Sequence, residues 1–229
     1  MAKVIPRESK RITYSSEIRA LKLVEFTPEQ ISVVNGSLLG DACLYTAWPG
    51  TSKNYTFAKM HSVKQSEYVN WVYEKLKPFT HTPPKPYAPT QSVRLRTISH
   101  ATFTALVPLF YRDGKKILPS TMADIMVDRL AVAVWFMDDG NAMMRDGICA
   151  GYHLNTQSFD HAEHERLVAL FEELHGIKAN IEKNKGYYRI SIMQRASREK
   201  FRELIQEHII PSMRYKLGYM GDSFRTRRD

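Results

Sequence analysis

Two aspartates, Asp41 and Asp139, each stand directly after an apolar run with helical character. The carbonyl end of a helix carries partial negative charge, so a carboxylate there is disfavoured unless a cation compensates for it. If the two apolar helices pack side by side, both carboxylates meet at one end. Hard oxygen ligands suit Mg²⁺, which also accepts substrate phosphate oxygens. The matched pair predicts a divalent-metal site, whereas one such aspartate alone could equally cap a turn.

The elements that would position Asp41 begin with a capping signature, Thr27-Pro28-Glu29-Gln30, which predicts a buried helix ending at the aspartate. Two strands are expected next, 42–48 and 54–61, joined through Pro49-Gly50. An amphipathic helix around 69–76 follows, then a proline-rich stretch, 81–89, which can be an edge strand or a loop. A strand over 91–100 and a helix containing Pro108 complete this part.

The same order of elements recurs around Asp139. A second apolar helix, 128–137, precedes the strands 141–145 and 148–155. An amphipathic helix ending at Gly176 comes next, and the strands 177–183 and 187–193 are joined by Asn184-Lys185-Gly186. A last helix follows. Lys116 and Lys216 follow the closing helix of each part at nearly equal distances from Asp41 and Asp139. The chain therefore reads as an internal duplication of one α/β unit.

The alternation of side chains predicts which face of each strand is free to meet a partner. In the strand 91–100, Val93 and Leu95 should face the core, which leaves Arg94 and Arg96 on the other face. In the second half, the residues expected to face the core are Ile148, Ala150, Tyr152, Leu154, Tyr188, Ile190 and Ile192. The outward residues are then His153, Asn155, Tyr187, Arg189 and Ser191. Arginine, asparagine and histidine are suitable partners for base edges or phosphates.

Composition is consistent with a folded protein that binds a polyanion. Hydrophobic residues make up 43% of the 229 positions, and the formal net charge is +9. The two cysteines, Cys43 and Cys149, argue against a disulfide framework or a zinc site and favour a reducing compartment. No apolar run is long enough to cross a membrane, and the N-terminus lacks the apolar stretch of a signal peptide. The eight histidines show no metal-ligand spacing, and His161 and His164 are expected on a solvated helix surface.

Two stretches, Asn35-Gly36-Ser37-Leu38-Leu39-Gly40-Asp41-Ala42 and Trp135-Phe136-Met137-Asp138-Asp139-Gly140, resemble the two signature motifs of the LAGLIDADG homing endonucleases. Their order and spacing are similar to the monomeric, two-motif branch, and the likeness covers nearly the whole chain after about residue 27. The stretches 154–159 and 211–217 support it. Four positions depart from the signature, namely Asn35, Ala42, Val134, where the family prefers glycine, and Met137, where it prefers an acid.

The resemblance implies a fold of class α/β (α+β), with two pseudo-symmetric αββαββα halves, antiparallel saddle-shaped sheets and a junction through the two motif helices. Residues 1–26 would form a basic N-terminal arm, 27–120 the first half and 121–229 the second. It further implies that Asp41 and Asp139 bind catalytic Mg²⁺ with help from the backbone carbonyls of Gly40 and Asp138. Lys116 and Lys216 would lie near the scissile phosphates, and the sheets would read DNA in the major groove.

The expected activity is therefore a double-strand break with short 3′ overhangs in a long asymmetric DNA target, made by a monomer for intron mobility. One alternative is a group I intron RNA maturase of the same fold. Another is a DNA-binding module that has lost cleavage. We expect double-stranded DNA, and on the first alternative intron RNA, as the partner, and no membrane. The expected location is intracellular, in a mitochondrion or chloroplast if the gene is organellar and otherwise in a bacterial cytoplasm.

Overall fold

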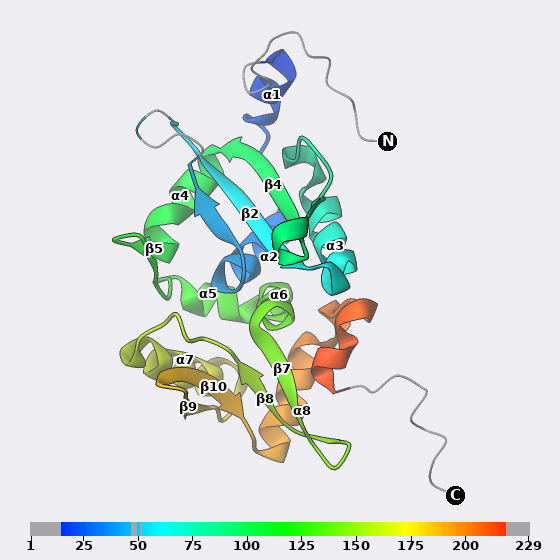
Figure 1. Ribbon diagram of the computed structural model, residues 1–229. Coiled ribbons are helices and arrows are strands. Elements are labelled where there is room, and N and C mark those ends of the chain that lie inside the picture. The colour runs from blue at the N-terminus through cyan, green and yellow to red at the C-terminus, as the bar shows by residue number, and fades with distance from the viewer. Residues whose placement is uncertain (1–14, 47–49, 51, 219–229) are drawn as a thin grey trace, which may run out of the picture. The chain divides into compact units, whose positions relative to one another are not determined.

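A computed structural model describes residues 15–46, 50 and 52–218, and its main features are two four-stranded antiparallel sheets and the helices packed on them (Figure 1). The described residues fall into two compact units. The first holds those up to Ile31 together with Ala42–Val107, and the second holds Ser32–Asp41 and those from Pro108 onward. Helices α2 and α4 contribute residues to both units. The boundaries expected from sequence, 27–120 and 121–229, stay a prediction.

The observed order of elements confirms the two αββαββα repeats. The first repeat is α2 (Pro28–Leu39), β1 (Cys43–Tyr45), β2 (Tyr55–Ser62), α3 (Ser66–Leu76), β3 (Lys85–Tyr87), β4 (Ser92–His100) and α4 (Ala101–Phe110). The second repeat is α6 (Arg129–Asp139), β7 (Gly140–Arg145), β8 (Ile148–Leu154), α7 (His161–His175), β9 (Asn180–Asn184), β10 (Tyr187–Ile192) and α8 (Arg195–Ile205). The strand orders β1-β2-β4-β3 and β7-β8-β10-β9 are equivalent. Both sheets therefore have one topology.

Local signals set several of these boundaries. At the start of α2, the Gln30 amide donates to the Thr27 hydroxyl at 3.3 Å, and the Thr27 amide donates to the Gln30 side chain at 3.0 Å. This reciprocal pair is the predicted capping box. Gly176 ends α7 with φ of 58°, as a left-handed C-terminal residue does. Lys185 and Gly186 both have positive φ, which gives the β9–β10 hairpin its tight turn.

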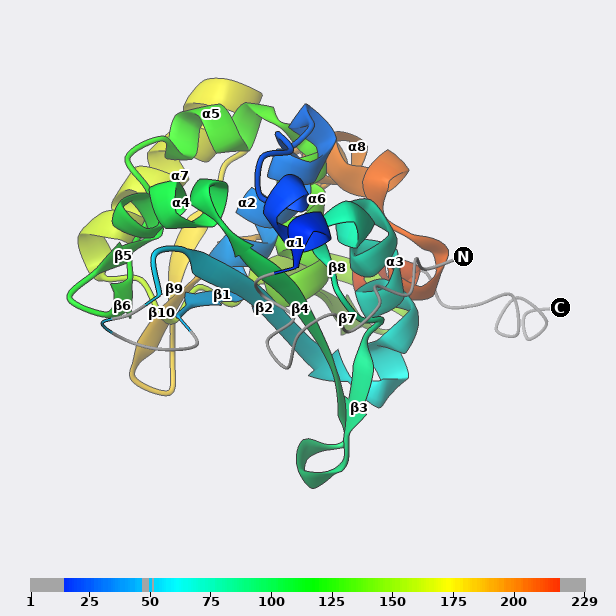
Figure 2. The same cartoon turned by 90° about the horizontal axis from the view of Figure 1, so that it is seen from above.

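The first sheet packs one face against α3 and α4 (Figure 2). Val93 and Leu95 of β4 are buried there, and Phe57 of β2 stacks on Phe103 of α4 at 5.8 Å. β3 lies at the edge of the sheet, where its proline costs no ladder hydrogen bond. The stretch 47–49, which includes the expected end of the first strand and Pro49, lies outside the described residues.

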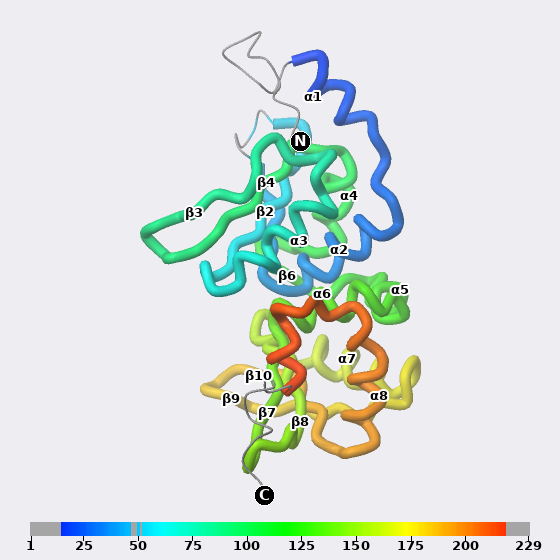
Figure 3. Tube along the Cα trace, turned by 90° about the vertical axis from the view of Figure 1, so that its right-hand side faces the viewer, coloured from blue at the N-terminus to red at the C-terminus, as the bar shows by residue number. Residues whose placement is uncertain are grey.

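The second sheet packs against α7 and α8 (Figure 3). Phe136, Tyr152 and Phe201 form its aromatic centre, with ring centroids 5.4 to 5.7 Å apart. The expectation that Ile148 faces the core is wrong, because its side chain is 70% exposed. The β7–β8 register shifts between Met143 and Met144, which leaves Ala150 as an extra residue. One extra residue reverses the in–out alternation beyond it, so Ile148 turns to solvent.

Several features were not expected from the sequence. Helix α1 (Ser16–Leu21) lies within the stretch expected to be a basic arm, and its Ile18 is buried against Phe79 and Ile98. The short hairpin β5 (Tyr111–Arg112) and β6 (Lys115–Lys116) and the helix α5 (Met122–Val127) precede α6. The arm's basic residues Lys3, Arg7, Lys10 and Arg11 lie outside the described residues.

His164 is fully buried rather than solvated, so that expectation is wrong. Its ring pairs with the Thr156 hydroxyl at 2.8 Å and with the Asp160 carbonyl at 2.6 Å, which satisfies both nitrogens. His161 is exposed, as expected. Among the described residues, no helix is both long and apolar enough to cross a bilayer.

Candidate metal centre and nucleic-acid surface

The C-terminal part of α2 packs directly on α6 through small residues. A methyl group at Gly36 would lie 2.3 Å from the Ala131 carbonyl oxygen and 2.8 Å from the Cβ of Val134. A methyl group at Gly40 would lie 2.3 Å from the Cβ of Asp138. Both contacts are closer than a side chain can tolerate, so glycine is required at both positions. Val134, which departs from the signature, is accommodated because Gly36 opposite it has no side chain.

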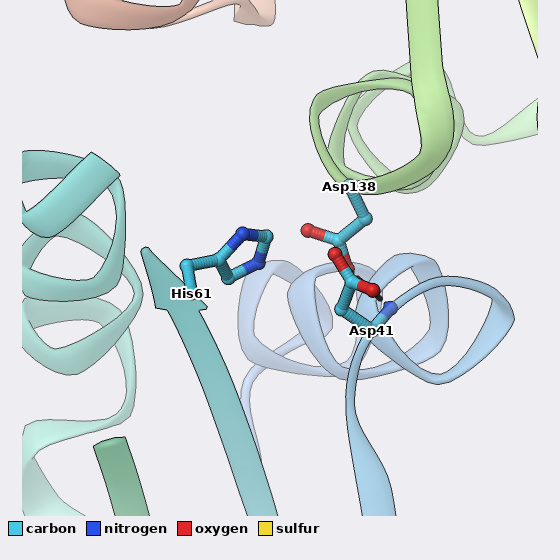
Figure 4. Close-up of side chains that lie close together, drawn as sticks. All are labelled: Asp41, His61 and Asp138. Carbon is cyan, nitrogen blue, oxygen red and sulfur yellow. Dashed lines mark hydrogen bonds between the residues drawn. The ribbon is translucent and has the colours of Figure 1, made fainter. Parts of the chain in front are cut away.

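This close packing gathers the acidic residues at the C-terminal ends of the two helices. The Asp41 amide donates to the Asp138 carboxylate at 3.1 Å (Figure 4). Carboxylate oxygens of these two residues lie within 4.8 Å of each other. Asp138 is buried, whereas Asp41 is exposed. The side chain of Asp138 had not been singled out from the sequence, which assigned only its carbonyl.

The surroundings of Asp139 clearly perturb its carboxyl group. Burial raises its pKa to about 8, and the neighbouring charges of Asp138 and Asp41 act in the same direction. The ammonium groups of Lys116 and Lys216 oppose this shift without cancelling it. Strong shifts of this kind concentrate at functional sites. Burial and the neighbouring carboxylates thus disfavour the ionised form of Asp139, and a bound cation would favour it.

Both predicted lysines lie at this cluster. Lys116, on β6, donates to the Gly40 carbonyl. Lys216 lies in the 3₁₀ segment Pro211–Leu217 and donates to the carbonyls of Met137 at 2.6 Å and Asp138 at 2.7 Å. Each ammonium group thus offsets the negative end of one motif helix. The two carbonyls expected to help bind metal, those of Gly40 and Asp138, accept from lysines here.

Asn155, which is expected on the base-reading face, donates its side-chain amide to the backbone of the cluster. Its side chain donates to the Asp139 carbonyl at 2.8 Å and to the Asn141 side chain at 3.2 Å. Its backbone amide donates to the same Asp139 carbonyl at 3.0 Å. These bonds fix the backbone of Asp139 where α6 ends. Asn141, immediately after Gly140, was missed, because a lone asparagine at a strand start carries no specific signal.

In the first sheet, the predicted arginines lie on the face away from the helices. Arg94 is half-buried, with its guanidinium carbon 4.2 Å from the centre of the Tyr87 ring. Arg96 is exposed and lies 5.5 Å from the centre of the Tyr45 ring. Stacking on an aromatic face orients a guanidinium group without occupying its N–H donors. The donors therefore stay available to a partner.

The second sheet orients its polar residues differently. Tyr187 is 60% exposed, as expected. His153 and Ser191 are only 6% and 4% exposed, so the exposure expected for them is wrong. Arg189 is bound to Glu182, which also holds His153. His153 and Ser191 are register partners on adjacent strands, and His153 also pairs with Glu182, contacts that alternation along one strand cannot reveal.

Comparison with known proteins places this arrangement in a family. Residues 31–201, well over half of the chain, match the LAGLIDADG DNA endonuclease family. The chain belongs to this family. The fold is also that of the homing endonuclease I-WcaI bound to its DNA recognition sequence, with a TM-score of 0.75 over 89% of this chain and 93% of that one, at 24% identity.

The chain is also similar to two proteins of different kinds, a maturase and a RecA protein. The chain is 27% identical to the cytochrome b mRNA maturase bI2 of Debaryomyces hansenii over 83% of its own length and 74% of the maturase. It is also 27% identical to the protein RecA of Mycolicibacterium flavescens over 82% of its own length. The matched part is 46% of that RecA protein, so the chain spans about half the length of this relative.

Proposed function

We propose that this protein is a divalent-metal-dependent DNA endonuclease that makes a double-strand break in a long, asymmetric duplex. The observation that carries the proposal is the pairing of Asp41 with the Asp138-Asp139 dipeptide at the ends of two helices in contact through Gly36 and Gly40. A structural role alone would not require three carboxylates at the negative ends of two helices. Membership of a DNA endonuclease family supports the same activity.

Hard carboxylate oxygens gathered in one cluster fit a divalent cation, and we assign its binding to Asp41 and Asp139. The backbone carbonyls of Gly40 and Asp138 would serve as further oxygen donors once they share or exchange the hydrogen bonds that they accept from Lys116 and Lys216. When bound, Mg²⁺ would supply an activated water and neutralise charge on the phosphate and the leaving oxygen. The raised pKa of Asp139 means that its proton must leave before the carboxylate can take a cation.

The lysines have a distinct role in this proposal. Lys116 and Lys216 hold their ammonium groups at the ends of α2 and α6, beside the carboxylates. A phosphate that enters the cluster would find one positive charge contributed after each repeat. These charges would orient the phosphate and stabilise the negative charge that develops during hydrolysis. The duplication then accounts for two cuts, one per strand.

We assign DNA reading to the outward faces of the two sheets, since β-ribbons can enter the major groove. In the first sheet the readers are Arg94 and Arg96, whose donors stay available on tyrosine rings. In the second sheet the more exposed candidates are Tyr187 and Arg189. The less exposed residues His153, Asn155 and Ser191 would support these two readers. A single chain carrying both repeats can act as a monomer.

The test is a cleavage assay on duplex DNA that spans the uninterrupted insertion site of the host gene, with Mg²⁺, with Ca²⁺ and with EDTA. We expect a double-strand break with short 3′ overhangs in Mg²⁺ and intact DNA in EDTA. The Asp41→Asn/Asp139→Asn variant should bind the duplex and leave it uncut. Duplex that the wild-type protein binds but does not cut in Mg²⁺ would refute the nuclease.

A second candidate function, an RNA maturase, is favoured by the 27% identity to a cytochrome b mRNA maturase over most of this chain. It predicts affinity for the host intron RNA, and splicing of that RNA in the presence of the protein. Competition between intron RNA and duplex DNA for the protein decides whether one surface serves both. Binding of RNA without cleavage of DNA would leave the maturase as the only supported function.

A further inference from the structure

Glu182 is the single acidic residue in the strands that the structure describes, which include both four-stranded sheets and the β5–β6 hairpin. The first sheet has basic residues and no carboxylate in its strands. A negative charge on a surface that binds phosphates weakens that binding. The position of Glu182 on such a surface therefore needs a physical explanation.

Its neighbours provide one. Glu182 on β9 is the register partner of Arg189 on β10. One carboxylate oxygen accepts from Arg189 Nη2 at 2.5 Å, and the other pairs with His153 Nε2 on β8 at 3.0 Å. The three side chains thus lie on three adjacent strands. Counting the side chains alone, the exposed fractions are 39% for Glu182, 17% for Arg189 and 7% for His153, so the carboxylate is the most accessible member.

This pairing changes what Arg189 can do. A guanidinium group without an acidic partner attracts any phosphate and adds affinity for every DNA sequence. Arg189 is neutralised locally, and one of its two terminal nitrogens is held in a fixed place. Arg94 of the first sheet, stacked on Tyr87, has no carboxylate in its own sheet strands. The two sheets therefore present their arginines in different electrostatic states.

We propose that Glu182 is a specificity-determining residue: it positions Arg189 to contact the edge of a guanine, and it neutralises the positive charge of Arg189 that would otherwise attract phosphates. Guanine is the base whose O6 and N7 accept together from an arginine. A wrong base leaves the clamped arginine unsatisfied and places the carboxylate against an acceptor. His153 pairs with the second carboxylate oxygen of Glu182 and so helps to hold it in place. This inference rests on the proposed DNA-binding function and extends it to one named position.

The test compares Glu182→Gln with Glu173→Gln in the full chain, using Ca²⁺ buffer. Glu173 is exposed on α7, so the control makes the same change in net charge away from the sheet. The probes are a randomised duplex library and the duplex that the wild-type protein selects from it. We expect Glu182→Gln to bind the unselected library more tightly and to steepen the salt dependence by about one phosphate contact. Its preference for the selected duplex should fall about tenfold.

Selection from the library with each variant identifies the position. Glu182→Gln and Arg189→Ala should both lose the guanine preference at one and the same base pair, whereas Glu173→Gln should keep it. Unchanged discrimination and salt dependence in Glu182→Gln would overturn the inference while leaving the nuclease proposal intact. A wild-type protein that selects no sequence and cuts no duplex would overturn both. Thermal melting of each variant excludes loss of folding as the cause.

Discussion

At the scale of single residues, the perturbed carboxyl of Asp139 couples protons, metal and folding. Its pKa in the folded protein is raised from 3.8 to about 8, so the folded state holds the proton more tightly than the unfolded chain does. The stability from this group is fully present below the unfolded value, and it is lost as pH rises through about 8. A bound divalent cation would reverse the penalty by stabilising the ionised form.

Asp139→Asn should therefore make the metal-free protein more stable at pH 8 than the wild type, by a few degrees of melting temperature, because about 1 kcal/mol corresponds to 2–4 °C in a protein of this size. The difference should shrink toward pH 5. Added Mg²⁺ should raise the melting temperature of the wild type more at pH 8 than at pH 6, and should leave the variant nearly unchanged. Melting curves with and without Mg²⁺ measure both effects.

The matched control is Asp146→Asn, in the turn between β7 and β8. Asp146 has φ of 52°, a conformation that asparagine tolerates as well as aspartate does. The substitution Asp146→Asn removes one acidic charge and does not alter the carboxylate cluster. Equal effects of the two substitutions at pH 8 would show that net charge, not the environment of Asp139, sets the response.

Gly36 sets the distance between the motif helices. In Gly36→Ala the new methyl group would meet the Ala131 carbonyl at 2.3 Å, and a backbone atom cannot move aside as a side chain can. We expect a loss of about 2–3 kcal/mol in unfolding free energy, typical of overpacked sites, and a larger loss of cleavage. Denaturant titration measures the first, and cleavage of the selected duplex the second.

Val134→Ala is the informative companion, because it removes atoms from the same contact without adding any. It should cost less stability than Gly36→Ala. The double variant should recover little, because the clash with the Ala131 carbonyl remains. Full recovery in the double variant would show that Val134, not the backbone, limits how closely the helices approach.

At the scale of elements, sequence predicts what local patterns determine. The helix starts at Thr27 and Asp128, the stop at Gly176 and the turn at Lys185-Gly186 follow from caps and from residues that tolerate positive φ. The six-residue helix α1 escaped prediction because so short a helix depends on tertiary packing, here of Ile18. The exposure of Ile148 was mispredicted because a bulge leaves no reliable mark in the alternation.

The residues of the candidate site likewise fall into those that sequence patterns predict and those that they do not. Asp41, Asp139, Lys116 and Lys216 could be found because the duplication repeats them, and the structure brings them together. The side chain of Asp138 and the amides of Asn141 and Asn155 could not, since their roles arise from contacts across the α2–α6 packing and the β7–β8 pair. Pairing of Glu182 with Arg189 likewise depends on strand register, which one strand does not encode.

The two sheets should differ in how they use their arginines. Arg94→Ala should lower the slope of log affinity against log salt by about 0.9, the value of one phosphate contact. Arg189→Ala should change that slope much less, since Glu182 already neutralises its charge. Titrations of the unselected duplex library over a series of salt concentrations measure both slopes. Equal changes would mean that Arg189 contacts phosphate and that the Glu182 pair opens on binding.

At the scale of the whole molecule, the two repeats share a topology but differ in the polar side chains that their sheets carry. The first sheet presents Arg94 and Arg96 over tyrosines, while the second presents Tyr187 and the Glu182–Arg189–His153 cluster. In the proposed function, equivalent strands would therefore offer different donors and acceptors to DNA. If the two sheets read DNA as proposed, they would not read two identical half-sites equally well, in contrast to the equal subunits of a symmetric dimer.

We therefore expect palindromic duplexes, built by inverting either half of the selected target, to be cut at least about tenfold more slowly than the target, since each mismatched base pair costs about 1–3 kcal/mol. Glu182→Gln should also lower the cleavage rate of the palindrome built from the half that carries the proposed guanine. The cleavage rate of the other palindrome should not change. Initial cleavage rates in Mg²⁺ at fixed salt measure this. Equal rates on the target and both palindromes would show that neither repeat discriminates between the two half-sites. In that case the duplication would serve the paired carboxylates alone.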